Sequence, residues 1–215
     1  MELFAYSTVV VLAYLLGSIP SGYLAGRAKG VDIRQVGSGN IGATNVLRTL
    51  GKPIGITVLI ADALKGFLAA KFVPTLAAWL LPQAFQSEAL TTGAAVAAGI
   101  AVVLGHNYTC WLRFKGGKGI ATSGGMVLAL APVAALTAIA AWGLAFLLTR
   151  YVSVASIVAA LVLPFAVWFW GGTPLLVGVI SGLSALAIYK HRPNIRRLLE
   201  GTEHRFKPGT KEPAT

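Results

Sequence analysis

The chain has 215 residues, 56% of them hydrophobic and only 12% charged, with a formal net charge of +11 and a mean hydropathy of +0.74. Soluble domains usually carry about 25% charged residues, so this composition excludes an ordinary soluble domain. The single cysteine, Cys110, excludes an internal disulfide and a multi-cysteine metal site.

Long apolar runs without charge, such as Leu3–Leu16 and Ala89–Leu104, predict membrane-spanning helices. In hydrocarbon each backbone polar group must bond within its own segment, and this requirement favours helices. The fold class is therefore predicted as all-α, a polytopic membrane protein. In chain order the predicted spans lie at about 3–25, 53–81, 89–108, 121–148, 152–170 and 173–189.

The placement of lysine and arginine predicts the orientation of these spans. Fifteen of the 18 lie in three segments, 27–52, 113–118 and 190–215, between or after apolar runs. Positive charge beside membrane spans marks the cytoplasmic side and attracts anionic head groups and solutes. We therefore expect the three segments to share that side, with the lipid bilayer and anionic solutes as partners and no nucleic acid.

The stretch 121–190 leaves two span counts open. A break near Pro132 would give seven spans in all and place the basic tail inside. Two helices of about 14 residues reach only about 21 Å each, short of the roughly 30 Å core, so thinning, tilt or partial re-entry has to cover the gap. We predict seven spans, with the N-terminus outside and the C-terminus cytoplasmic. The alternative is five spans with the same parity.

We predict a single membrane domain over residues 1–206. The polar residues 207–215 are predicted to form a disordered tail. No convincing internal repeat relates one part of the chain to another.

The first basic segment contains a glycine-rich loop with candidate substrate-binding residues Gly37, Ser38, Gly39, Asn40, Thr44, Asn45 and Arg48. Glycines let the backbone turn and present N–H groups to an anion, and the small polar side chains add donors. A helix starting near Gly42 would show Thr44 and Arg48 on one face, with its positive end toward a phosphate. Gly51 and Pro53 would then end this helix and begin the next span. The alternative is an interfacial turn whose glycines only allow tight packing.

The second basic segment again places a glycine-rich turn before a helix, with the residues Gly116, Gly117, Lys118 and Gly119. Leu112 and Gly119 stand where a Walker A loop needs glycine and a hydroxyl residue, so that nucleotide motif is excluded. The turn is predicted to bind a phosphate. A basic topology signal is the alternative, although such a signal needs no glycines.

The third basic segment contains His191 and Asn194, which are three residues apart and can face the same point. Pro193 suits the first turn of a helix. An apolar stripe that includes Ile195 and Leu198 predicts that this helix lies along the membrane surface. By itself such a segment is more often a basic anchor than a catalytic element.

Charged and histidine residues also occur inside the predicted spans. Asp62 and Lys65 are three apart on one helix face, where they would either form an ion pair or support the substrate site. His106 ends the third span and is expected to be packed and hydrogen-bonded. No Gly-x-Ser-x-Gly elbow occurs, and no histidine has an acid five residues later. Two phosphate-type loops without a nucleophile or metal cluster indicate phosphorylated reactants and catalysis by positioning.

Together these segments closely resemble the acyl-phosphate-dependent glycerol-3-phosphate acyltransferase family of bacterial membranes. The resembling stretches cover nearly the whole chain: 17–23, 36–48, 62–66, 114–122 and 191–203. One departure is Thr109-Cys110, where the family often has an aromatic–proline pair.

The resemblance implies seven spans, an active site on the cytoplasmic face of the cell membrane, and lysophosphatidic acid and phosphate as products. It implies acyl phosphate and glycerol 3-phosphate as substrates, without metal or cofactor, and a soluble enzyme that makes acyl phosphate as a further partner. The residues it implies as critical for activity are Ser38, Arg48, Lys118, His191 and Asn194, with Glu203 important for integrity. A transporter of a phosphorylated or anionic solute is the alternative function, although such proteins usually have repeated halves and a site near the midplane.

Overall fold

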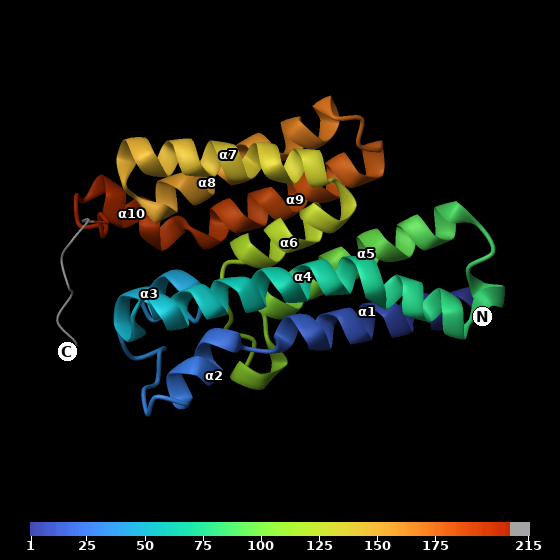
Figure 1. The fold of residues 1–215 in the computed structure, drawn as a ribbon, viewed down its shortest axis with the longest axis horizontal. Helices are drawn as coiled ribbons and strands as arrows, with labels where there is room; N and C mark the ends of the chain where they lie inside the picture. The colour runs from blue at the N-terminus through green and yellow to red at the C-terminus, as the bar shows by residue number, and fades with distance from the viewer. Residues whose placement is uncertain (207–215) are drawn as a thin grey trace. The chain divides into compact units, whose positions relative to one another are not determined.

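The computed structural model describes residues 1–206, and every regular element within them is a helix (Figure 1). This confirms the predicted all-α class. The helices form two compact units, Met1–Leu130 and the residues from Ala131 onward. The single domain over 1–206 stays a prediction, and the predicted tail at 207–215 lies outside the described residues.

The first unit contains α1 (Glu2–Ser18), α2 (Ser21–Arg27), α3 (Ala43–Leu50), α4 (Lys52–Leu80), η1 (Pro82–Ala84), α5 (Glu88–Asn107), η2 (Cys110–Leu112) and α6 (Ile120–Leu130). α1 packs on α5 and α4, and α4 also packs on α5 and α6. Glycines allow these helices to approach closely, because a side chain at Gly17 would overlap the Val102 backbone and one at Gly66 the Thr122 backbone. The unit is therefore held by backbone-to-backbone approach as much as by large side chains.

α1 and α5 run in the same direction through this unit. Tyr6 donates from its hydroxyl to the carbonyl of Leu90 at one end (2.6 Å), and Tyr14 donates to the carbonyl of Tyr108 at the other (2.7 Å). Both helices therefore finish at one end of the unit. The two glycine-rich loops follow there, and α4 and α6 begin there.

The predicted first span corresponds to one candidate span, Glu2–Arg27, whose helix is interrupted at Pro20, between α1 and α2. Proline has no backbone N–H to donate, so the helix ends before it. Side chains bind the carbonyls left at the break: Thr109 Oγ1 donates to Ser18 O (2.6 Å) and Lys65 Nζ donates to Ile19 O (2.9 Å). One of the carbonyls at the break is therefore bound by a buried lysine that α4 carries.

The second unit contains α7 (Pro132–Thr149), α8 (Val152–Phe169), α9 (Pro174–Lys190) and α10 (Arg192–Leu199). α8 packs on both α7 and α9. The break predicted near Pro132 is present, since α6 ends at Leu130 and α7 begins at Pro132. The helices on its two sides have 11 and 18 residues, however, rather than about 14 each.

Four helical segments among residues 1–206 are long and apolar enough to cross a membrane: Glu2–Arg27, Glu88–Leu112, Pro132–Thr149 and Val152–Phe169. The pair α9 and α10, bent by 50°, gives a fifth if it is counted as one span. Large apolar side chains are exposed on these helices, such as Leu147 (74%) and Phe165 (71%), as contact with lipid requires. By length and apolarity, the protein is an all-helical membrane protein with four to five candidate spans.

Candidate functional site

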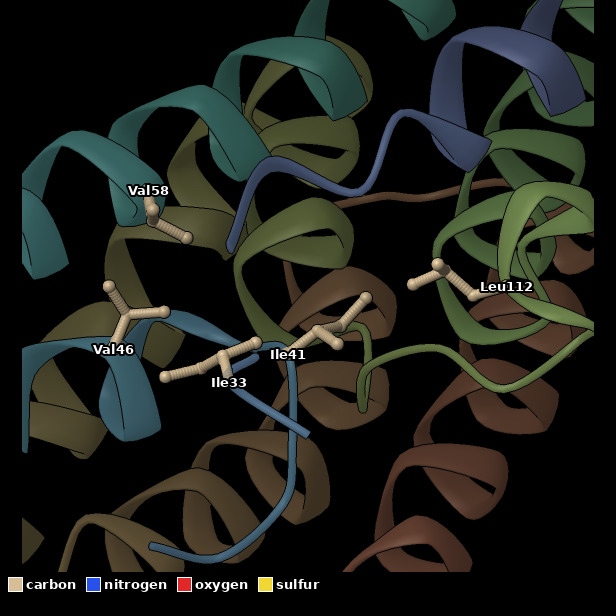
Figure 2. Close-up of a cluster of buried hydrophobic side chains, with 5 residues drawn as sticks. All are labelled: Ile33, Ile41, Val46, Val58 and Leu112. Atoms are coloured by element: carbon tan, nitrogen blue, oxygen red, sulfur yellow. The ribbon is translucent and has the colours of Figure 1, made fainter. Parts of the chain in front are cut away.

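An apolar cluster joins the two glycine-rich loops of the first unit. Ile33 and Ile41 come from the first loop, Val46 from α3, Val58 from α4 and Leu112 from η2, and all five are buried (Figure 2). Burial of such side chains is worth about 1.5–3 kcal/mol each. The cluster therefore anchors the first predicted phosphate-binding loop and η2, the short helix that precedes the second loop.

The first loop is shaped by the side chain of Asn45, which is buried on α3. Asn45 Nδ2 donates to the carbonyls of Ile33 and Val36 (3.1 Å each), and Asn45 Oδ1 accepts from the N–H of Ser38 (2.9 Å). Gly37 has a φ of +59°, and a Cβ there would also overlap Asn45 Oδ1. Asn45, a predicted substrate-binding residue, thus holds the loop by its side chain.

Several N–H groups of the first loop bond within the loop itself. Ser38 N is bonded to Asn45, Gly39 N donates to Val36 O (3.0 Å), and Gly42 N donates to Asn40 Oδ1 (2.8 Å). These groups were the predicted backbone donors to an anion. Because they are used internally, we expect side chains to make the main contribution to anion binding here.

The side chains suited to that role lie on or just before α3. The helix begins at Ala43, as the glycines predicted, and carries Thr44 and Arg48 four residues apart, both half-buried. Ser38 is exposed in the loop. Gly51, with a φ of +91°, separates α3 from α4. The first loop therefore offers two hydroxyls and a guanidinium at the end of the unit.

The second loop is docked on the C-terminal end of α5. The N–H of Gly116 donates to the carbonyl of Asn107 (3.2 Å), and the N–H of Gly117 donates to the carbonyl of His106 (3.0 Å). Carbonyls at a helix end lack a partner inside the helix, so this contact satisfies them. Lys118 follows immediately and is half-buried. The glycines therefore determine where Lys118 lies.

Asp62, Lys65 and His106 form a buried polar group inside the first unit, with exposures of 2%, 5% and 5%. Lys65 Nζ lies 2.8 Å from Asp62 Oδ1, and His106 Nδ1 lies 3.6 Å from the same oxygen. An isolated buried charge would be costly, and pairing reduces that cost. Of the two alternatives left open for Asp62 and Lys65, the structure displays the ion pair.

In the second unit, the carboxylate of Glu203 joins two helices. Glu203 Oε1 accepts from Ser153 Oγ of α8 (2.8 Å) and from Asn194 Nδ2 of α10 (2.7 Å). Glu203 Oε2 accepts from Arg197 Nε of α10 (2.7 Å). These bonds determine which way the Asn194 amide faces.

His191 lies buried at the junction of α9 and α10. Its Nδ1 is 2.8 Å from the carbonyl of Ala187, and its own carbonyl accepts from Asn194 N (2.8 Å). A proton on Nδ1 makes the first contact a hydrogen bond and leaves Nε2 of the neutral ring as an acceptor. The structure therefore brings His191 and Asn194 together on one buried turn.

The pKa of the Glu203 carboxyl reflects two opposing effects. Burial raises this pKa, but the hydrogen bonds from Asn194, Ser153 and Arg197 outweigh burial and leave it below the ordinary value of 4.5. A pKa lowered by folding means that the stabilisation is complete above the unfolded-state value and is lost as the pH falls through the folded-state value. Glu203 therefore stabilises the protein at neutral pH, and this contribution disappears on acidification.

Replacing Glu203 by alanine is expected to lower the free energy of unfolding by about 2–4 kcal/mol, because three donors lose a charged acceptor. Thermal unfolding of the purified protein in detergent measures this loss. Glu200→Ala is the matched control, since Glu200 pairs with Arg196 through side chains that are 49% and 82% exposed. It should cost less than about 1 kcal/mol. Equal losses in the two variants would contradict the role of Glu203.

Three residues make polar contacts that the sequence patterns did not single out: Ser153, Arg197 and Thr109. Ser153 binds Glu203 from an apolar helix, where a buried polar residue is itself a signal of a hydrogen bond to another segment. Thr109 belongs to the pair that departs from the family pattern, and its hydroxyl donates to the carbonyl of Ser18 at the end of α1. Arg197 lies within the third basic segment, but residue spacing did not show that Glu203 is its partner.

Within residues 1–206, no three or more His, Cys, Asp or Glu side chains form a group that could hold a metal ion. Cys110 is a half-buried free thiol in η2.

The chain matches the family model described as "Glycerol-3-phosphate acyltransferase" over residues 7–201. Similar proteins include the glycerol-3-phosphate acyltransferase of Geobacter sulfurreducens, 49% identical over 93% of this chain and 96% of that protein. The one from Aquifex aeolicus is 46% identical over 92% of this chain and 97% of that protein.

Solved structures similar to this chain are crystal structures of PlsY (YgiH), an integral membrane glycerol 3-phosphate acyltransferase. Its glycerol 3-phosphate form has a TM-score of 0.82 and 43% identity, with 96% of each chain covered. Its lysophosphatidic acid form has a TM-score of 0.80 and 42% identity, with 96% of this chain and 95% of that chain covered.

Proposed function

Because this chain belongs to the glycerol-3-phosphate acyltransferase family, we propose that it transfers an acyl chain from acyl phosphate to the 1-hydroxyl of sn-glycerol 3-phosphate. The products are lysophosphatidic acid and inorganic phosphate. The observation that carries the proposal is that both glycine-rich loops lie at one end of the first unit, where Ile33 and Ile41 of the first loop and Leu112, shortly before the second, share one buried cluster. Each loop leads to a cation, Arg48 or Lys118, of the kind that binds phosphate.

The proposed roles follow from the chemistry of each side chain. Arg48 offers a planar fork that can bind two phosphate oxygens at once, and Lys118 offers a compact charge. Ser38 adds a hydroxyl to hold phosphate. His191 and Asn194 position the hydroxyls of glycerol 3-phosphate, and the remaining loop residues support binding through the shape of the two turns.

In the proposed reaction the 1-hydroxyl oxygen attacks the acyl carbonyl carbon. The bond between that carbon and the bridging phosphate oxygen breaks, and the hydroxyl proton goes to a phosphate oxygen of a reactant. Acyl phosphate is an activated donor, so a strong protein base is not required. In this proposal His191 orients the substrate rather than acting as the base.

The direct test supplies purified protein with acyl phosphate and glycerol 3-phosphate. We expect lysophosphatidic acid and phosphate in equal amounts, and no product when acyl-CoA or acyl carrier protein replaces acyl phosphate. Product from acyl-CoA alone would overturn the choice of donor. Absence of any acyl transfer, together with movement of an anionic solute across vesicles, would favour the transporter alternative.

For the membrane arrangement we propose seven spans, with the N-terminus outside and the active site and C-terminus on the cytoplasmic face of the bacterial cell membrane. The three basic segments support this orientation. To reach seven, α4, α6 and α9 must be added to the four long apolar segments, although α6 has only 11 residues. A soluble enzyme that makes acyl phosphate would meet the protein on this cytoplasmic face.

Labelling of single cysteines in intact cells tests the orientation in a background without Cys110. Thr202→Cys is preferred to the neighbouring Gly201, whose φ is +68°. We expect an impermeant reagent to leave position 202 unlabelled until the cells are opened. Gln86→Cys, in the exposed loop between α4 and α5, should be labelled from outside and is the control. Ready labelling of position 202 in intact cells would overturn the orientation.

A further inference from the structure

The second glycine-rich loop meets the buried polar group of the first unit through the ring of His106. On one side, His106 Nδ1 lies 3.6 Å from Asp62 Oδ1. On the other side, the ring lies against Gly117, where an added Cβ would overlap Nε2. The ring therefore stands between a buried carboxylate and the backbone of the loop.

The carboxylate that faces this ring is itself held in place. Asp62 Oδ1 pairs with Lys65 Nζ at 2.8 Å, and Lys65 Nζ also donates to Ile19 O at 2.9 Å, at the break between α1 and α2. Asp62 and Lys65 are carried by α4, and His106 is in the last turn of α5. The Nδ1 edge of the ring faces this carboxylate at a distance longer than a hydrogen bond, and the Nε2 edge faces Gly117 of the loop.

We propose that Asp62 and His106 are positioning residues for phosphate binding. Asp62 orients the His106 ring, the ring sets the position of Gly117, and Gly117 sets the position of Lys118. The inference rests on the proposed function, because it takes Lys118 as a residue that binds substrate phosphate. The proposal also explains why position 117 is a glycine, because a side chain there would overlap the His106 ring.

The neighbouring glycine supplies a matched comparison. The three atoms nearest to a Cβ at Gly117 all belong to the side chain of His106, whereas a Cβ at Gly116 would overlap the backbone of His106 and Asn107. Neither glycine is among those with a left-handed φ, so alanine is not strained by its own backbone at either position. Removing the His106 ring should therefore make room for alanine at 117 but not at 116.

The experiment compares full-length purified variants in detergent. It measures kcat and KM for glycerol 3-phosphate, together with the unfolding temperature. Gly117→Ala is expected to raise KM by about tenfold or more, because a small displacement of a binding group is costly. Adding His106→Ala should bring KM back to within about threefold of the His106→Ala variant, as expected for two residues in direct contact. Adding His106→Ala to Gly116→Ala should not lower the KM of that variant.

Two further variants separate positioning from general support of the fold. Asp62→Asn should raise KM while changing kcat little, whereas a merely structural defect would lower the active fraction and leave KM unchanged. Tyr6→Phe removes one interhelical hydrogen bond at the opposite end of α1 and should leave KM at the wild-type value. If Gly117→Ala folds poorly, its activity cannot be compared. A rise in its unfolding temperature when His106→Ala is added would then show the contact between the two residues.

The outcomes distinguish this inference from the function on which it rests. A wild-type protein that neither binds glycerol 3-phosphate nor acylates it overturns the proposed function. An active wild type, combined with independent effects of Gly117→Ala and His106→Ala on both KM and unfolding temperature, overturns only the positioning role. If the KM of Asp62→Asn is unchanged, Asp62 has no part in positioning the loop.

Discussion

Replacing Arg48 by lysine should lower kcat/KM by about tenfold or more, although the positive charge is retained. The guanidinium is a planar fork that binds two phosphate oxygens, and an ammonium group cannot reproduce that geometry. Arg48 is half-buried in the last turn of α3, so the helix limits the directions in which a replacement can reach. Steady-state kinetics with both substrates varied measures the loss.

Arg27→Lys is the control for this substitution. Arg27 is exposed at the end of α2, in the same basic segment but outside the glycine-rich motif. The Arg27→Lys variant should retain wild-type kinetics, because Arg27 contributes only a positive charge to the segment and lysine keeps that charge. Wild-type kinetics in Arg48→Lys would refute a bidentate contact and leave electrostatic attraction alone.

His191→Gln should retain at least about tenfold more activity than His191→Ala if His191 orients the substrate. The Nδ1 side of the ring faces the Ala187 carbonyl at 2.8 Å, and in the proposed role Nε2 is the atom that meets a substrate hydroxyl. A glutamine amide reaches approximately as far as Nε2 and can form a hydrogen bond there. Activity of both variants across a range of pH is the measurement.

Asparagine at position 191 provides the matched control. Its amide reaches only as far as Nδ1, so His191→Asn should resemble His191→Ala. If glutamine and alanine lower activity equally, and the residual activity of both variants lacks a limb of the pH–rate profile near about 6.5, His191 is instead the general base.

Helix positions were largely predictable because hydrophobic length and proline placement act locally. The helices expected at 53–81 and 89–108 correspond to α4 and α5, and Pro132 separates α6 from α7 as predicted. The break at Pro20 was missed, because a run of apolar residues does not reveal whether distant side chains can satisfy the exposed carbonyls. Lys65 and Thr109 do so, and both are far from Pro20 in sequence.

For the candidate site, the sequence identified which residues carry suitable chemistry but not how each one is used. Glycine content predicted two phosphate-type loops, yet the N–H groups of Gly116 and Gly117 bind the end of α5. Asn45 was expected to meet substrate, but its amide is bonded within the loop. These hydrogen bonds depend on which segments meet in space, and residue spacing contains no such information.

By itself the sequence determined that the chain is an all-helical membrane protein of the glycerol-3-phosphate acyltransferase family, because hydropathy and ordered motifs are properties of the linear chain. Only the tertiary structure decided that Asp62 pairs with Lys65 beside His106, and that Glu203 links Ser153 to Asn194. The physical reason is the cost of burying charge. A carboxylate in an apolar interior needs partners within hydrogen-bonding distance, and those partners come from whichever helices pack around it.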